Sequence, residues 1–161
     1  ATIYADATPY LRKEYALRIT GHSLGGAVAA ILAEYYAKDG YRVERLVTFG
    51  QPRVSTRKTP QDEDGLLART TRVVNDLDVV PMIPPYSVVR KYQHFPPEVI
   101  LLPGPGYVYL PEHDADRLSV SDFWRNASNL SVEDHHIGGY LANIRGKVAT
   151  GARQVPYTFE K

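Results

Sequence analysis

The run Gly21-His22-Ser23-Leu24-Gly25 has the residue types and the spacing that nucleophilic attack on a carbonyl group requires. A serine that attacks a carbonyl must sit on a very sharp strand-to-helix turn, which pushes its hydroxyl into the open. Glycines two positions before and two positions after the serine leave room for this strained turn and for close packing of the helix on the strand. The backbone N–H of Leu24 then points to where an oxyanion forms. The pattern predicts that Ser23 is a nucleophile.

Such a serine needs a histidine to accept its proton and a carboxylate to orient that histidine. On scaffolds that carry this turn, the partners follow in the order serine, acid, histidine. Asp76 and Asp78 come directly after an expected strand at 71–75, and parallel sheets present their chemistry at the carboxyl ends of strands. His135 and His136 lie further on, at the start of the last expected helix. The residues alone leave both pairs open.

Three other histidines are weaker candidates for the base. His22 is adjacent to Ser23, and because neighbours on such a turn point apart, we interpret it as a packing residue. His94 lies before an expected hairpin. His113 has acidic neighbours, but no helical or hairpin spacing focuses them on a metal ion, so we expect a solvated loop there. The neighbours are Glu112, Asp114 and Asp116.

Alternating strands and helices must position these residues. A buried strand is expected at 15–19, and apolar residues recur at helical spacing through 24–38, where Lys38-Asp39-Gly40 ends the helix. Further buried strands are expected at 45–49 and 71–75. Between them lie a polar loop, 55–65, and at most a short helix at 66–69. The face of the first helix that we expect to be buried consists of Leu24, Val28, Ile31, Leu32 and Tyr35.

The second half of the chain predicts a hairpin and two helices. Val99–Leu102 and Tyr107–Leu110 are separated by Pro-Gly-Pro-Gly, which is typical of a hairpin. A helix is expected near Phe123-Trp124. The alternation of strands and helices favours a mostly parallel α/β sheet with flanking helices in a single domain. The last helix is expected to bury a face made of Ile137, Tyr140, Leu141, Ile144 and Val148.

Composition excludes several classes of protein. The chain has 161 residues, a net charge of +1 and no cysteine, so it has no electrostatic footprint for nucleic acid, no disulfide and no thiolate metal site. No stretch has the apolar length of a transmembrane helix. Asn126-Ala127-Ser128 and Asn129-Leu130-Ser131 fit the N-glycosylation pattern, which weakly favours secretion and leaves the compartment open.

Five separate blocks of the chain resemble class 3 lipases, which are the triacylglycerol lipases of the fungal Rhizomucor and Thermomyces type with bacterial and plant relatives. The first block is the turn around Ser23, and the last is Asp134-His135 with Tyr140. The resemblance runs from about residue 16 to about residue 145 in the expected order. The blocks lie at residues 21–27, 48–54, 72–85, 92–98 and 134–140.

The resemblance implies an α/β-hydrolase fold and assigns the two open pairs. The family's acid precedes a Val-Val-Pro run, which selects Asp78, and its histidine follows an aspartate and precedes a tyrosine, which selects His135. Ser23 matches the nucleophile. His94 matches a non-catalytic position that supports the acid loop, which is the loop that carries Asp78. The family hydrolyses carboxylic esters, chiefly acylglycerols, through an acyl-enzyme at lipid–water interfaces, and it needs no cofactor.

The chain departs from the family before the serine. Only 22 residues precede Ser23, and the family has far more there, including early strands, a second oxyanion donor and a lid helix. We hypothesise that residues 1–161 are the C-terminal part of one α/β-hydrolase domain, whose missing N-terminal part is a partner. We expect the strand before Ser23 to be an exposed edge. The alternatives are an esterase acting on short-chain or feruloyl-type esters, and a lipid- or protein-binding module without activity.

Overall fold

The computed structural model describes residues 2–54, 65–84, 92, 94, 97–111 and 131–157. Within these ranges the strands form one sheet in the order β1-β2-β3-β4-β5-β6, and every neighbouring pair is parallel except the antiparallel hairpin of β4 and β5. The mostly parallel sheet and the hairpin that we expected are therefore confirmed. The strands are β1 (Ala16–His22), β2 (Arg42–Phe49), β3 (Thr70–Asn75), β4 (Glu98–Leu101), β5 (Gly106–Leu110) and β6 (Arg153–Gln154).

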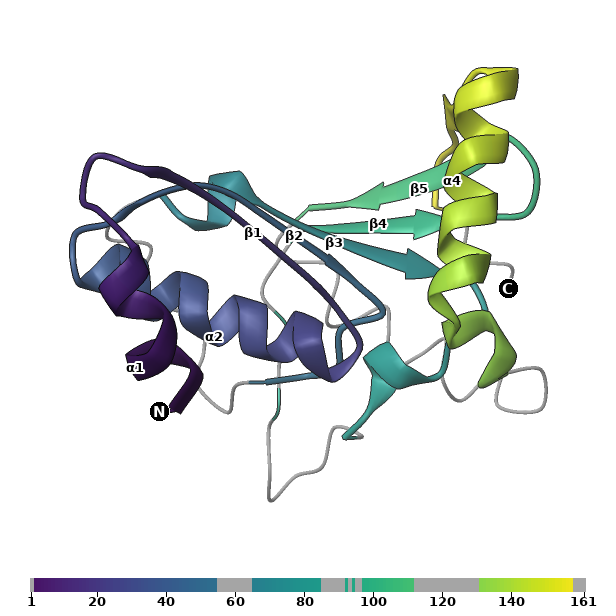
Figure 1. Ribbon diagram of the computed structural model, residues 1–161. Coiled ribbons are helices and arrows are strands. Elements are labelled where there is room, and N and C mark those ends of the chain that lie inside the picture. The colour runs from purple at the N-terminus through teal and green to yellow at the C-terminus, as the bar shows by residue number, and fades with distance from the viewer. Residues whose placement is uncertain are drawn as a thin grey trace.

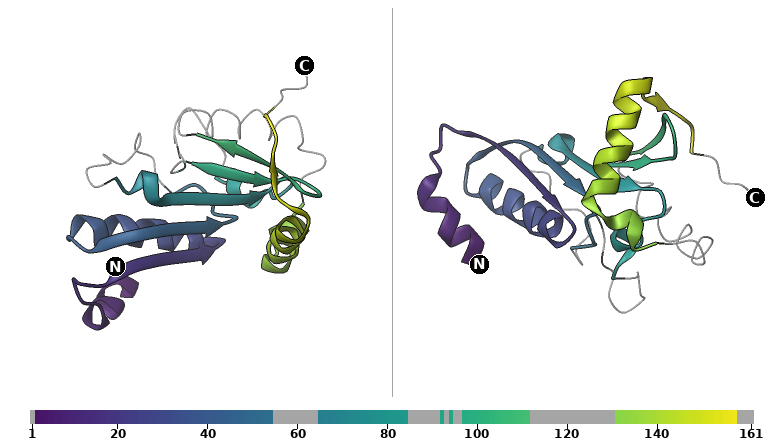
Figure 2. Two further views of the ribbon diagram at one scale, coloured as in Figure 1. Left: turned by 90° about the horizontal axis from the view of Figure 1, so that it is seen from above. Right: turned by 45° about the vertical axis from the view of Figure 1, so that its right-hand side comes forward.

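The helices lie in two places relative to the sheet. Figure 1 shows α2 (Leu24–Lys38) along one face, with α1 (Thr2–Ala7) beside it, and α4 (Ile137–Thr150) across the carboxyl ends of the strands. In the left view of Figure 2, α2 lies behind β1 and β2, and α4 lies at the strand ends. No helix in the described ranges is long and apolar enough to cross a membrane. The short 3₁₀ turns are Thr8–Tyr10, Leu67–Arg69, Val80–Met82 and Glu133–His135.

The predicted helix over 24–38 is confirmed, but the prediction of its buried face is right only in part, because Val28 and Leu32 are half-buried and the other three residues are not buried. Leu24, Ile31 and Tyr35 are exposed, and the side that packs on the sheet consists mainly of small residues. Small side chains allow the helix backbone to approach the strands closely, and the sharp turn around Ser23 requires that approach. The buried residues of α2 are Gly26, Ala27, Ala29, Ala30, Ala33 and Tyr36.

The face predicted for the last helix is buried only in part. Tyr140 is buried, and Ile144 packs with it against the ends of β3 and β4. Lys147 is also buried and donates to the carbonyl of Leu102. Because α4 crosses the strand ends rather than lying flat on the sheet, only a narrow stripe of it makes contact (Figure 1). The rest of the predicted face is exposed, namely Ile137, Leu141 and Val148.

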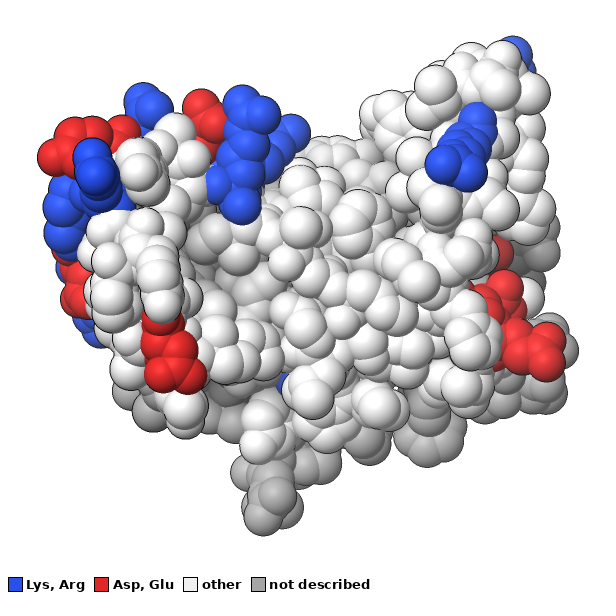
Figure 3. Space-filling view, viewed as in Figure 1, with Lys and Arg blue, Asp and Glu red and all other residues white. Residues whose placement is uncertain are grey.

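Strand β1 forms the edge of the sheet. It pairs with β2 on one side, and no strand of the described residues lies on its other side. The exposed edge that we expected before Ser23 is therefore present. Figure 3 shows that charged side chains gather at the end of the molecule that holds α1 and the start of β1, whereas the middle of this face, over β1 and α2, carries few of them. Helix α2 carries exposed apolar side chains at Leu24, Ile31 and Tyr35.

Two expected elements lie outside the described residues. These are the helix near Phe123-Trp124 and nearly all of the polar loop at 55–65. The acidic cluster around His113 and the two glycosylation-type triplets also lie there, apart from Ser131.

Candidate active site

Ser23 sits on a strained turn between the last residue of β1 and the first residue of α2. Its backbone has φ 57° and ψ −131°, which is rare for a residue with a side chain and costs on the order of 1–3 kcal/mol. The surrounding backbone holds this conformation. The Ser23 N–H donates to the carbonyl of Phe49 at 2.9 Å, and the Ser23 carbonyl accepts from the N–H groups of Gly26 and Ala27 at 2.9 and 3.2 Å.

Two glycines permit the close approach of α2 to β1. A Cβ atom on Gly21 would lie 2.2 Å from the carbonyl oxygen of Gly25, and one on Gly26 would lie 3.1 Å from the carbonyl oxygen of Gly21. A Cβ atom on Gly25 would have no described atom within 4 Å. We expected the second crowded glycine to be Gly25, two positions after the serine. This expectation is wrong by one position, because the close contact on that side is at Gly26.

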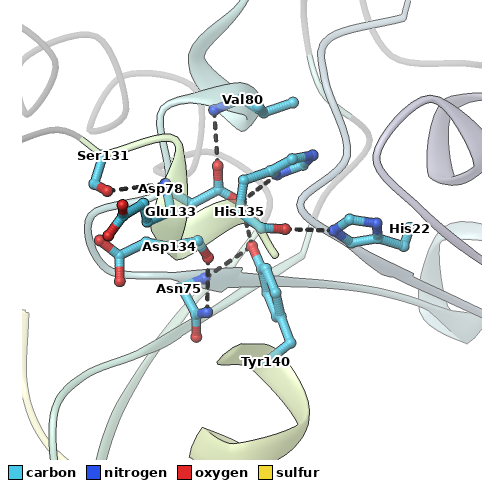
Figure 4. A network of polar contacts seen from close by, with 9 residues as sticks. All are labelled: His22, Asn75, Asp78, Val80, Ser131, Glu133, Asp134, His135 and Tyr140. Carbon is cyan, nitrogen blue, oxygen red and sulfur yellow. Dashed lines mark hydrogen bonds and ion pairs between the residues drawn. The ribbon is translucent and has the colours of Figure 1, made fainter. Parts of the chain in front are cut away.

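Asp78 and His135 form a hydrogen-bonded pair. The Asp78 side chain is 0% exposed, and its Oδ2 lies 2.9 Å from His135 Nδ1 (Figure 4). The Asp78 Oδ1 accepts the backbone N–H of Val80 at 2.8 Å. Because a carboxylate only accepts, Nδ1 of His135 carries the proton, and the lone pair of a neutral imidazole is left on Nε2. That Nε2 is buried and has no hydrogen-bond partner among the described residues.

The competing residues of each pair lie elsewhere. Asp76 and His136 are both exposed, and His136 is the residue that precedes the first turn of α4. The structure therefore brings Asp78 and His135 together and leaves the other two at the surface. The catalytic roles of Asp78 and His135 stay predictions, as does that of Ser23.

Gly50 connects the turn around Ser23 to the Asp78–His135 pair. It follows Phe49 at the end of β2, and its φ is +55°. A Cβ atom on Gly50 would lie 2.8 Å from Asp78 Oδ2 and 2.9 Å from both Cε1 and Nδ1 of His135. The backbone therefore passes directly against both side chains. Sequence reasoning missed this role, although a glycine closing an apolar strand was the available signal.

Tyr140 is a further partner of Asp78. Its hydroxyl donates to Asp78 Oδ2 at 2.6 Å and accepts the backbone N–H of Asn75 at 3.0 Å. Burial, together with the negative charge of Asp78, raises the pKa of Tyr140 far above its ordinary value. The phenol therefore stays protonated and remains a donor. The sequence marked Tyr140 only as a helix-face residue and as part of a family block.

His94 and the acid loop are joined by one contact. His94 is buried, and its Nε2 donates to the carbonyl of Pro81 at 2.6 Å. Burial lowers the pKa of His94 well below its ordinary value, and the nearby charges of Arg72 and Arg53 lower it further. A neutral His94 thus supports the loop after Asp78, in line with the position that the resemblance assigns to it.

The other groups singled out from the sequence are the backbone N–H of Leu24, the side chain of His22 and possible metal ligands. Leu24 is the first residue of α2, and its N–H belongs to the first turn, where helical N–H groups lack intrahelical acceptors. Its side chain is exposed, which leaves the start of the helix open. His22 contacts His135, so the interpretation of His22 as a packing residue is incomplete. No group of three or more metal-ligating side chains occurs in the part of the chain that the structure describes.

Known proteins resemble the chain in sequence. The family model for lipase (class 3) matches residues 7–88. Secreted mono- and diacylglycerol lipase 1 of Fusarium solani is 41% identical over 87 residues, which are 54% of this chain and 25% of that protein. The chloroplastic phospholipase A1-Igamma1 of Arabidopsis thaliana is 35% identical over 155 residues, which are 89% of this chain and 29% of that protein. The chain thus spans about a quarter of the length of such relatives.

Solved lipase structures resemble the fold. A triacylglycerol lipase with a serine-protease-type triad is 26% identical with a TM-score of 0.51, over 83% of this chain and 50% of that one. A mutant form of MDLA from Penicillium cyclopium is 21% identical with a TM-score of 0.55, over 89% of this chain and 52% of that one, and it bears on the fold alone. The expected α/β-hydrolase fold is confirmed.

Proposed function

The chain belongs to the class 3 lipase family, and from this premise we propose that it hydrolyses carboxylic esters, chiefly acylglycerols, with Ser23, His135 and Asp78. One observation carries the proposal. His135 donates from Nδ1 to the fully buried Asp78 at 2.9 Å, and its Nε2 has no partner among the described residues. The His135 ring lies against Gly50, which directly follows Phe49, whose carbonyl accepts the N–H of Ser23. A serine, an imidazole and a carboxylate in this order are the groups that acyl transfer through a covalent intermediate needs.

The proposed reaction has two halves. His135 Nε2 takes the proton of the Ser23 hydroxyl as its oxygen attacks the ester carbonyl, and Asp78 stabilises the imidazolium that forms. The N–H of Leu24 stabilises the oxyanion, and losing one such donor typically lowers turnover about 100–1000-fold. The imidazolium then gives its proton to the departing alcohol. Water attacks the acyl-serine in the same way, and the free acid leaves with Ser23 restored.

The substrate class is testable with a graded panel. We expect hydrolysis of p-nitrophenyl esters to increase with acyl length and emulsified acylglycerol to be cleaved, with Ser23→Ala inactive on every substrate. The panel includes phosphatidylcholine, because a relative that matches 89% of this chain is named a phospholipase A1. Activity confined to two to four acyl carbons would make the protein an esterase. Inactivity at every length would instead favour a lipid- or protein-binding module.

We propose further that the second oxyanion donor and the lid belong to an N-terminal part of the same protein. The open edge of β1 and the match to only 50% of a lipase structure support this proposal. Mass spectrometry of the purified natural protein tests it. A mass near 18.0 kDa in a fully active preparation would contradict the proposal.

A further inference from the structure

His22, the last residue of β1, makes two contacts with His135. Its Nε2 lies 2.6 Å from the backbone carbonyl oxygen of His135, and Figure 4 shows the ring pointing at that oxygen. Since a carbonyl only accepts, Nε2 of His22 carries the proton. The two imidazole rings also stack, with centroids 4.5 Å apart and planes inclined by 29°. The ring of Tyr140 meets His22 edge-on at 5.9 Å.

The segment 131–135 that carries His135 is tied mainly to β3 and the loop after it. The side-chain amide of Asn75 donates to the carbonyl of Asp134 at 3.0 Å, and the N–H of Ser131 donates to the carbonyl of Leu77 at 3.0 Å. These contacts fix His135 relative to Asp78, because Asp78 follows the same strand. They reach Ser23, which follows β1, only indirectly, through β2, which pairs with both β1 and β3.

The contact from His22 joins the two halves of the site, which are Ser23 after β1 and the Asp78–His135 pair held at the end of β3. His22 is covalently bonded to Ser23, so its hydrogen bond places the backbone of His135 at a set distance from the turn that holds the serine. Proton transfer needs about 2.6–3.2 Å between the heavy atoms, and a misplacement of about 1 Å can cost about 100-fold in rate. We propose that His22 is a positioning residue that sets the separation of Ser23 and His135, and this proposal rests on the proposed function.

A matched pair of substitutions isolates the hydrogen bond. His22→Gln keeps an N–H donor near the position of Nε2, and His22→Met has a similar length without a donor. We expect His22→Met to lower kcat about 10–100-fold on p-nitrophenyl esters, with KM changed less than about twofold. We expect His22→Gln to stay within about threefold of the unsubstituted protein. Thermal unfolding of both variants shows whether they are equally folded.

Nuclear magnetic resonance gives a readout that does not depend on activity. Imidazole ¹⁵N shifts should show His22 protonated at Nε2, and the carbonyl ¹³C shift of His135 should move in His22→Met but little in His22→Gln. The proton on His135 Nδ1, bonded to Asp78, should persist in both variants, because that bond belongs to the other half of the site.

The possible outcomes separate the two proposals. If the unsubstituted protein cleaves no ester but the carbonyl shift responds as expected, the proposed function fails and the contact stands. Equal kcat values for His22→Gln and His22→Met would overturn the positioning role, as would a change confined to KM. If His22→Met does not fold, His22→Asn replaces it, since its amide is one methylene too short to reach the carbonyl. Full activity of His22→Asn would then overturn the role.

Discussion

The carboxyl ends of β1 and β3 hold the two halves of the site in very different ways. Strand β3 lies inside the sheet between β2 and β4, and the buried pair of Arg72 and Glu98, 2.8 Å apart, joins it to β4. Among the described residues, three groups donate to the carboxylate of Asp78, which follows β3. Strand β1 pairs with β2 alone among the described strands, and the residue that follows it, Ser23, has a positive φ.

We infer from this difference that several independent contacts hold the acid in place, whereas few hold the nucleophile. We expect Asp78 to keep its place when one side-chain partner is removed, because the backbone N–H of Val80 and the remaining side chain still bond to it. On the other side, hydrogen bonds from a short stretch of backbone hold the strained conformation of Ser23. His22 is the residue of β1 that bonds to His135. We therefore expect substitutions of similar size to cost more activity around β1 than around β3.

The largest effect should come from the groups that exchange the proton. We expect Ser23→Ala and His135→Ala each to lower kcat about 10⁶-fold, since loss of either member of such a triad disables proton transfer. Ester hydrolysis measures the loss, and circular dichroism checks that the fold persists. The exposed His136→Ala is the matched control and should keep nearly full activity. Loss of activity in His136→Ala with activity kept in His135→Ala would move the base.

The acid should come second. Asp78→Asn removes the negative charge that stabilises the imidazolium and replaces one acceptor oxygen with an NH₂ donor, so it should lower kcat about 10⁴-fold while the serine and histidine remain. Asp76→Asn, two residues away and exposed, should leave turnover within about twofold of the unsubstituted protein. If the two variants behaved in the opposite way, Asp76 would be the acid. Kinetics at saturating ester distinguishes the two results.

Gly50 lies between the two halves and should come third. An alanine there would place its Cβ within 2.9 Å of Asp78 and His135, so we expect Gly50→Ala to lower kcat about 100-fold. Gly40→Ala is the control, because Gly40 also has a positive φ but has open space around its Cβ position. Both variants should lose about 1–2 kcal/mol of unfolding free energy in urea. Unchanged turnover in Gly50→Ala would show that the pair can shift without cost.

Tyr140→Phe should have the smallest effect on activity. It removes one of the three partners of Asp78 and leaves the N–H of Asn75 without its acceptor, so we expect about 1–3 kcal/mol of destabilisation in urea. Turnover should fall less than about tenfold, because Val80 and His135 still hold Asp78. A greater loss of kcat in Tyr140→Phe than in His22→Met would reverse the comparison between the two strand ends.

Much of the fold could be predicted from local patterns. The apolar stretches gave the order of strands and helices, and the Pro-Gly-Pro-Gly run gave the hairpin of β4 and β5. The buried faces of α2 and α4 could not be predicted from apolar spacing. On α2 the close approach at Gly26 selects small residues for the sheet side, and α4 makes only a narrow contact across the strand ends. Both depend on how an element packs rather than on its own sequence.

The sequence by itself determined the turn around Ser23, the order of its partners and the alternation that builds a parallel sheet, because these follow from backbone sterics and side-chain periodicity along the chain. The resemblance selected Asp78 and His135 from the two open pairs, but only the tertiary structure decided that these two side chains lie against each other and that Gly50 and His22 connect them to the serine. Those contacts join residues that are 57 and 113 positions apart, and local spacing carries no information about such distances.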